Sequence, residues 1–137
     1  YCHKVKHVCY KSKNIHFSID TNNQKEDFGQ LNVPLFEWVI ENLIRNAVDA
    51  MDGNGSIVIS LSDQTQFVYI DIADTGKGIS KSKYKTVFEP GYTTKQRGWG
   101  LGLSLTKRII ENYHAGKIFV KSSEIDKGTT FRIVLNK

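Results

Sequence analysis

The sequence is short of cysteine and of long apolar runs, and each shortage excludes a class of protein. Cys2 and Cys9 are the only cysteines among 137 residues, too few to cross-link a domain of this size, so we expect reduced thiols. No stretch approaches the ~18 consecutive apolar residues of a membrane span, and no signal-peptide pattern opens the sequence. We therefore expect a single cytoplasmic domain. A metal site of Cys2, His3, His7 and Cys9 is the less favoured alternative, because such short Cys/His matches are often accidental.

Acidic side chains are scarce in parts of the chain, so the net charge of +5 is distributed unevenly along the sequence. Residues 1–13 carry four lysines and no acid, residues 14–76 sum to −8, and residues 77–108 sum to +7. Nucleic-acid binders typically present one broad basic face with interleaved aromatic side chains, so we expect no nucleic-acid partner. An acidic half beside a short basic segment instead suits a polyphosphate bound together with a divalent cation.

Hydrophobic periodicity divides the chain into strands and helices. Residues 1–13 have no clear period and are interpreted as a tail, and residues 21–33 are polar, with at most a short strand at 31–33. Alternating apolar residues predict strands at 14–20, 56–62, 67–73, 117–123 and 129–135, the last four paired as two hairpins. Pro34 opens a predicted helix over 34–51. A short helix is predicted at 80–87, and a longer one at 103–113 with apolar residues Leu103, Leu105, Ile109, Ile110 and Tyr113.

The predicted helix at 34–51 has an informative polar side. Its buried stripe is predicted to be Phe36, Val39, Ile40, Leu43, Ala47 and Ala50. Asn42 and Asn46 lie one turn apart at the edge of this stripe, with Asp49 next on the same side, although asparagine is a mediocre helix former. A single asparagine there would usually be an internally satisfied polar residue. Together, these amide and carboxylate groups can supply the hard oxygen ligands and hydrogen-bond donors that a magnesium polyphosphate requires.

A segment from Asp74 to Leu103 holds more than half of the eleven glycines and carries many lysines but, after Asp74, a single acid, Glu89. These glycines are Gly76, Gly78, Gly91, Gly98, Gly100 and Gly102. Glycine allows close backbone approach, and free N–H groups at a helix start bind anions, so the segment predicts a phosphate-binding lid. A Walker A loop is not favoured, because Gly102 is followed by Leu103 rather than by Lys and Ser or Thr. An ordinary surface loop is the alternative, and glycine clusters in succession weigh against it.

Five motifs in order resemble those of the catalytic ATP-binding domain of sensor histidine kinases, in the GHKL superfamily that also contains DNA gyrase B, a heat-shock chaperone and the mismatch-repair ATPases. They are residues 41–47 (N box), 74–78 (G1 box), 88–90 with 93–95 (F box), 98–103 (G2 box) and 128–129 (G3 motif). We therefore expect residues 14–137 to form this domain and residues 1–13 a tail or linker. The resemblance implies an α/β (α+β) fold, a two-layer sandwich with helices on one face of a mixed, mainly antiparallel sheet, the Bergerat-type ATP-binding fold.

The resemblance also implies ATP and Mg²⁺ as cofactors and gives roles to individual residues. Asn46 would ligate Mg²⁺ with Asn42 beside it, and both would form the catalytic set with Lys95, which would also hold phosphates. Asp74 would accept hydrogen bonds from the adenine amino group, while Thr129 would assist through its hydroxyl or a water. The remaining nucleotide contacts are expected from Asp49, Gly76, Gly78, Ile79, Thr93, Thr94, Gly98, Gly100, Leu101, Gly102 and Leu103.

The function implied is transfer of the γ-phosphoryl group of Mg-ATP to a histidine on another domain. The family's phosphoacceptor histidine is followed by an acid, and none of His3, His7, His16 and His114 is. We therefore expect as partners a histidine-bearing dimerisation domain of the same kinase and a downstream response regulator. This domain alone is expected to be monomeric. The full protein could be a membrane-anchored sensor, of which this domain would be a cytoplasmic part.

Two alternatives to a histidine kinase domain stay open. A GHKL-type ATPase that drives a clamp is disfavoured by Asn42, because asparagine cannot act as a general base. A nucleotide-binding module without kinase activity is disfavoured by the intact asparagine, aspartate and glycine positions of the motifs.

Overall fold

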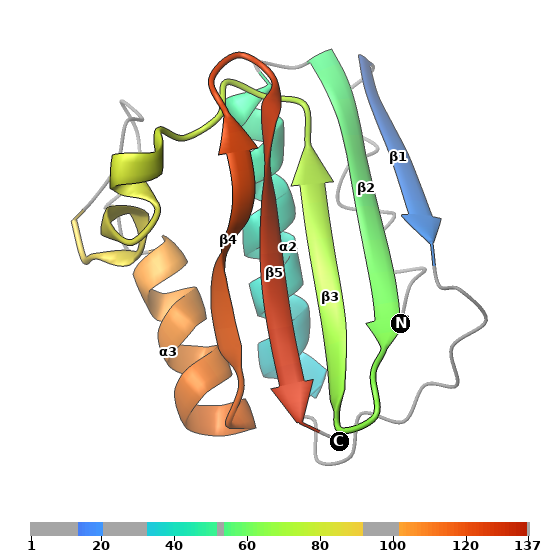
Figure 1. Cartoon of the computed structure of the whole chain (residues 1–137), viewed down its shortest axis with the longest axis vertical. Coiled ribbons are helices and arrows are strands. Elements are labelled where there is room, and N and C mark those ends of the chain that lie inside the picture. The colour runs from blue at the N-terminus through green and yellow to red at the C-terminus, as the bar shows by residue number, and fades with distance from the viewer. Residues whose placement is uncertain (1–13, 21–32, 52–53, 92–101, 137) are drawn as a thin grey trace.

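A five-stranded sheet forms one layer of the computed structural model, which describes residues 14–20, 33–51, 54–91 and 102–136. The strand order is β1-β2-β3-β5-β4. β1 pairs with β2 in parallel, whereas the β2–β3, β3–β5 and β5–β4 pairs are antiparallel (Figure 1). The strands are β1 (Asn14–Asp20), β2 (Asn54–Asp63), β3 (Phe67–Asp74), β4 (Lys117–Glu124) and β5 (Gly128–Asn136). Each strand predicted within 14–20, 56–73 and 117–135 is therefore confirmed.

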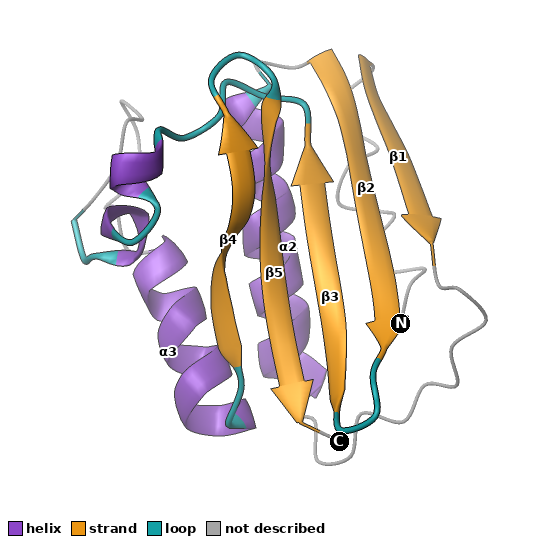
Figure 2. Cartoon of the chain, in the orientation of Figure 1, coloured by secondary structure: helices purple, strands orange, loops and turns teal. Residues whose placement is uncertain are grey.

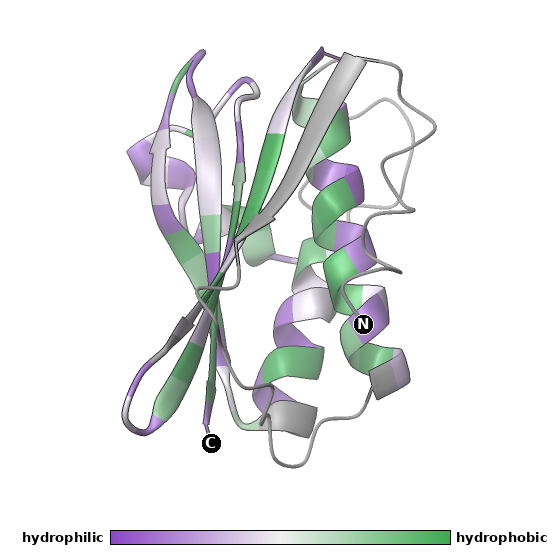
Figure 3. Ribbon diagram, turned by 90° about the vertical axis from the view of Figure 1, so that its right-hand side faces the viewer, coloured by the Kyte–Doolittle hydropathy of each residue, from purple (hydrophilic) through white to green (hydrophobic). Residues whose placement is uncertain are grey.

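Helices α2 (Val33–Ala50) and α3 (Gly102–His114) form the second layer, on one face of the sheet (Figure 2). α2 packs against β2 and β3, and α3 packs against β4 and β5. Seen from the side, the helices and the sheet face each other across the apolar core (Figure 3). This arrangement confirms the predicted two-layer fold with a mixed, mainly antiparallel sheet. Neither α2 nor α3 combines the length and the hydropathy that a bilayer-spanning helix needs.

The inward face of α2 carries the predicted apolar stripe, with one addition. Ile44 is fully buried although the predicted stripe omits it, because it lies one turn after Ile40 on a helix that the sheet covers broadly. Ala50, at the end of the stripe, is half-buried. The buried members are Phe36, Val39, Ile40, Leu43, Ile44 and Ala47, and they meet Ile57, Ile59, Leu61, Val68, Ile70 and Ile72 of β2 and β3 in the same core.

The orientation of α3 differs from the predicted one at two positions. Leu105 is 40% exposed, whereas Thr106 is 0% exposed and belongs to the inward face. Thr106 follows Leu103 by three residues and precedes Ile110 by four, the spacing of a single helical face. Because successive helical residues are about 100° apart, Leu105 lies to one side of that face. The expectation that Leu105 is a core residue was therefore wrong.

Residues 80–87 do not form the predicted single helix. The chain instead makes two short 3-10 turns, η1 (Lys81–Lys83) and η2 (Thr86–Phe88). Val87 and Phe88 of η2 are buried, and the Phe88 ring packs edge-on against Phe131 of β5 with centroids 6.0 Å apart. Lys107 Nζ of α3 lies 5.7 Å from the centre of the same ring. The turn is thereby anchored to both layers.

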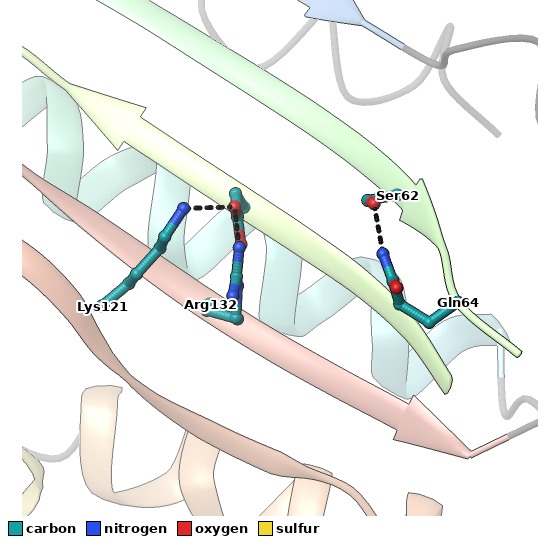
Figure 4. A network of polar contacts seen from close by, with 5 residues as sticks. Ser62, Gln64, Lys121 and Arg132 are labelled. Carbon is teal, nitrogen blue, oxygen red and sulfur yellow. Dashed lines mark hydrogen bonds and ion pairs between the residues drawn. The ribbon is translucent and has the colours of Figure 1, made fainter. Parts of the chain in front are cut away.

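The sheet face opposite the helices carries a charged network (Figure 4). Arg132 of β5 donates from Nε and Nη2 to the two carboxylate oxygens of Asp71 on β3, each at 2.8 Å, and Lys121 Nζ lies 3.5 Å from Asp71 Oδ2. Burial raises the pKa of Asp71, but the hydrogen bonds and charges of Arg132 and Lys121 outweigh it and lower the pKa below its ordinary value. The charged Asp71 therefore stabilises the folded domain at a pH above the ordinary pKa of Asp. This stabilisation is lost as the pH falls through the lowered pKa of Asp71.

Replacing Ile110 by alanine should destabilise the domain far more than the same shortening at Leu105. Ile110 is 0% exposed and its loss leaves a cavity, which costs about 2–5 kcal/mol of unfolding free energy. Leu105→Ala, on the same helix, should cost less than about 1 kcal/mol because its side chain already meets solvent. Urea denaturation of both variants measures the difference. Equal losses of stability would contradict the orientation of α3 described above.

Candidate nucleotide-binding site

Asp74 is a buried carboxylate at the end of β3. Its side chain is 8% exposed, and its Oδ1 accepts a hydrogen bond of 2.8 Å from the backbone N–H of Gly76. Thr129, opposite Asp74 on β5, contributes a second backbone hydrogen bond to the carboxyl. Burial raises the pKa of Asp74 above its ordinary value, although these two N–H groups act in the opposite direction. A carboxylate has about four acceptor positions, so Asp74 can accept further donors.

The loop that follows Asp74 runs between the end of α2 and the β4–β5 turn. Lys77 N–H donates to the Ala50 carbonyl at 2.9 Å and so caps α2, while the Lys77 carbonyl accepts from Asp126 N–H at 2.8 Å. Gly78 has φ +78°, and a Cβ there would lie 2.1 Å from the Glu124 carbonyl oxygen. No other residue type fits this position without displacing the turn. The backbone beside Asp74 is therefore fixed from both sides.

Ser123 of β4 connects this loop to its surroundings. Its hydroxyl accepts a hydrogen bond of 2.7 Å from Ile79 N–H and donates to the Gly128 carbonyl at 2.9 Å. It also lies 2.7 Å from Thr129 Oγ1, and Tyr84 OH donates to the Ser123 carbonyl at 2.9 Å. The Ser123 hydroxyl thus joins the loop after β3 to the start of β5, and the main-chain carbonyl of the same residue holds the segment that leads into η2.

The polar side of α2 lies against the start of α3. Asn42 and Asn46 are half-buried and Asp49 is exposed. Asn42 Nδ2 donates to Thr106 Oγ1 of α3 at 2.9 Å. Among the described residues no cluster of three or more His, Cys, Asp or Glu side chains could hold a metal ion. The predicted metal ligands are instead Asn42 and Asn46, whose amide oxygens are of the type that a hard cation prefers.

Apart from the exposed Asp49 near the end of α2, the predicted site residues that the structure describes fall into two groups joined by α2. One group surrounds Asp74 and contains Gly76, Gly78, Ile79 and Thr129. The other places Asn42 beside Gly102 at the start of α3, with Leu103 following and Asn46 one turn along α2. The remaining predicted residues lie outside the described part of the chain: Thr93, Thr94, Lys95, Gly98, Gly100 and Leu101.

Sequence reasoning missed Ser123, Tyr84 and Thr106. For Thr106 a signal existed, since it is a polar residue at a core spacing of α3. For Ser123 there was none. The register of β4 against β5 shifts between Val120 and Ser122, and this irregularity turns Ser123 rather than Ser122 toward the loop.

A family model described as histidine kinase-, DNA gyrase B- and HSP90-like ATPase matches residues 32–137. The chain belongs to this family. The ATPase-family domain is 43% identical over 98 residues to sporulation kinase E of Bacillus subtilis, which covers 71% of this chain and 13% of that protein. It is 36% identical over 128 residues to sporulation kinase A of the same organism, and this match covers 93% of this chain and 19% of that kinase. It thus spans less than a fifth of either kinase.

Solved structures place this ATPase-family domain among histidine kinase catalytic domains. The nucleotide-free catalytic domain of histidine kinase ThkA is 30% identical, with a TM-score of 0.82 over 99% of this chain and 91% of that one. The same kinase solved in complex with response regulator protein TrrA is 28% identical, with a TM-score of 0.78 over 99% of this chain and 40% of that one. The expected fold and the expected enzyme class, a histidine-kinase-type catalytic domain, are therefore confirmed.

Ser123→Ala should lower the unfolding free energy by about 1–3 kcal/mol, because it leaves the Ile79 N–H and the Gly128 carbonyl without their partner. Ser122→Ala is the matched control on the same strand, since Ser122 is exposed. Denaturant unfolding gives the two stabilities, and amide hydrogen exchange of Ile79 should become faster in Ser123→Ala alone. Unchanged exchange at Ile79 would show that Ser123 does not hold the loop.

Proposed function

We propose that this chain is the ATP-binding catalytic domain of a sensor histidine kinase, which binds Mg-ATP and donates its γ-phosphoryl group to a histidine on a separate dimerisation domain. The observation that carries the proposal is the buried carboxylate of Asp74, held by backbone N–H groups in a chain of this ATPase family. Its remaining acceptor positions suit the amino group of adenine, which is a neutral hydrogen-bond donor.

Residues around Asp74 would complete the recognition of the base. The Gly78 turn leaves no side chain between the loop and a bound ring, and the Thr129 hydroxyl would assist directly or through a water. Ile79 is half-buried next to this loop and would offer an apolar contact. The pocket so formed would distinguish bases by the direction of their hydrogen bonds rather than by charge.

The phosphates and the metal ion would lie toward α2 and the start of α3. Asn46, with Asn42 beside it, would ligate Mg²⁺ through amide oxygens, with Asp49 at the exposed end of the same side. Bound there, Mg²⁺ would neutralise charge on the phosphate oxygens. Thr93, Thr94 and Lys95 and the N–H groups of residues 100–103 would hold the phosphates by charge-assisted hydrogen bonds.

The partners follow from what the chain lacks and from its relatives. No histidine of the sequence is followed by an acid, so the accepting histidine would belong to a dimerisation domain of the same kinase. ThkA has been solved with a response regulator, which supports a downstream response regulator as the second partner. We propose that the domain itself is a cytoplasmic monomer that meets both partners in turn.

Adenine selectivity through Asp74 is the first test of this function. ATP should bind and GTP should not, because a carboxylate faces the O6 acceptor of guanine instead of an amino donor. Asp74→Asn should weaken ATP binding at least about tenfold, the value of a hydrogen bond to a charged group. The affinity for ATP should also fall on acidification, at a pH above the ordinary pKa of Asp. Burial raises the pKa of Asp74, and only the charged carboxylate keeps both of its oxygens as hydrogen-bond acceptors.

Calorimetry measures these affinities, with Asp71→Asn as the matched control. Asp71 lies on the same strand, but its carboxylate bonds to Arg132 on the opposite face of the sheet. This variant should lose stability and keep the affinity for ATP. Equal affinities of the wild-type domain for ATP and GTP would refute the role of Asp74.

Slow hydrolysis by the isolated domain is the second test, and it separates a kinase from a clamp ATPase. The position one turn before Asn46 is occupied by Asn42, whose amide does not take up a proton near neutral pH and so cannot activate water. Glu41 is the acid next to Asn42, but it is rotated by about 100° around the helix and so points away from Asn42 and Asn46. The chain alone should therefore release phosphate far more slowly than about 1 per second, an ordinary enzymatic turnover.

Labelled ATP mixed with this chain and a histidine-bearing dimerisation domain should give labelled protein that is stable to base and labile to acid, as a phosphohistidine is. The same dimerisation domain with its histidine replaced by glutamine is the control and should stay unlabelled. Fast phosphate release without the partner would move the assignment to a clamp ATPase. ATP binding with neither release nor transfer would indicate a nucleotide-binding module.

A further inference from the structure

Thr106 is a hydroxyl at a core position of α3. It is 0% exposed, and its buried neighbours on the inward face of α3, Ile109 and Ile110, are apolar. Its Oγ1 makes two hydrogen bonds, to the Gly102 carbonyl one turn earlier at 2.7 Å and to Asn42 Nδ2 of α2 at 2.9 Å. A valine of nearly the same shape would fill the space without a polar atom to satisfy, so packing alone does not account for the hydroxyl.

The single proton of the Thr106 hydroxyl decides how the Asn42 amide is oriented. A carbonyl oxygen only accepts, so at 2.7 Å the proton must lie between Thr106 Oγ1 and the Gly102 oxygen. The hydroxyl is then an acceptor toward Asn42, and the atom of Asn42 that faces it must be the NH₂ group. Turning the amide over would set two acceptors 2.9 Å apart in a buried place.

Gly102 holds the same amide from a second direction. A Cβ at Gly102 would lie 3.0 Å from both Nδ2 and Oδ1 of Asn42, so the carboxamide lies directly against the glycine. α3 begins at Gly102, and its first turn therefore determines both the position and the orientation of this side chain. With Nδ2 occupied by Thr106, Oδ1 is the atom left for a cation or for a donor bound to one.

We propose that Thr106 is a positioning residue that fixes the amide of Asn42 so that its oxygen, and not its nitrogen, is offered to the Mg-polyphosphate. This inference rests on the proposed function for its ligand, but the orientation of the amide is a property of the chain alone. Thr106 acts through Asn42 and does not itself reach the phosphates. Loss of its hydroxyl should let the amide turn over and present NH₂, which repels a cation.

Three variants separate this role from a structural one. Thr106→Val removes the hydroxyl and keeps the volume, Thr106→Ser keeps the hydroxyl and removes a methyl group, and Thr106→Ala removes both. If Thr106→Val fails to fold, Thr106→Ala still tests loss of the hydroxyl against Thr106→Ser, which has the same missing methyl. Denaturant unfolding checks that each variant is folded before binding is measured.

The first readout needs no nucleotide. The side-chain NH₂ signals of Asn42 in a ¹⁵N–¹H spectrum, assigned by their loss in Asn42→Asp, should show one proton protected from solvent exchange in the wild type and in Thr106→Ser. In Thr106→Val this protection should be lost. Protection that persists in the folded valine or alanine variant would overturn the inference, whatever the domain binds.

The second readout is the magnesium dependence of ATP binding. The Mg²⁺ concentration for half-maximal binding should rise about tenfold in Thr106→Val and Thr106→Ala, the lower end of the cost of removing an outer-shell partner of a metal ligand. Thr106→Ser should stay within about twofold of the wild type, and ATP affinity without Mg²⁺ should change little in any variant. An unchanged magnesium dependence with lost NH₂ protection would overturn the role of Thr106 toward the metal. Absence of ATP binding by the wild type would instead refute the proposed function and leave the NH₂ result to decide the amide orientation.

Discussion

A carboxylate buried at the end of β3 is the constraint on which the surrounding structure depends. Asp74 is 8% exposed, and a charged group in such a place persists only when hydrogen-bond donors surround it. Gly76 supplies one donor from the loop after β3, and Thr129 supplies another from the start of β5. The loop can reach this position only by turning tightly against the β4–β5 turn, which is where Gly78 lies against Glu124. The course of the backbone around the site thus follows from the need to satisfy one side chain.

Helix α2 transmits this arrangement to the rest of the domain because it takes part in both groups of site residues. At its end, the Ala50 carbonyl accepts from Lys77 in the loop after Asp74. Two turns earlier, Asn42 donates to Thr106 of α3. The apolar stripe of α2 holds it rigidly on the sheet, so the two groups keep a fixed separation. A ligand that contacts both groups would therefore meet side chains whose helix and strands are already packed together.

Most of the fold could be predicted from the sequence because its signals are local. Alternation with a period of two marks the strands, and spacing of three or four marks α2 and α3, since a side chain buried on one face must recur at the period of its own element. The short helix expected at 80–87 was wrong, because η2 is shaped by burial of Val87 and Phe88 against other elements rather than by its own periodicity. The prediction that Leu105 is a core residue was wrong for a related reason. An apolar residue beside the apolar stripe of a helix is assigned to the core from its spacing, and only the packing of the helix shows that it is exposed.

The sequence by itself indicated which residues to expect at the site, because Asn42 and Asn46 share one side of a predicted helix and Asp74 ends a predicted strand before two glycines. Only the tertiary structure decided how those groups are held. Ser123 faces the loop and Ser122 does not because the pairing of β4 with β5 shifts register between them. Hydrogen bonds such as these join residues far apart in the chain and depend on strand register and helix rotation. Both are set by the packing of whole elements against one another, which no single segment of the sequence encodes.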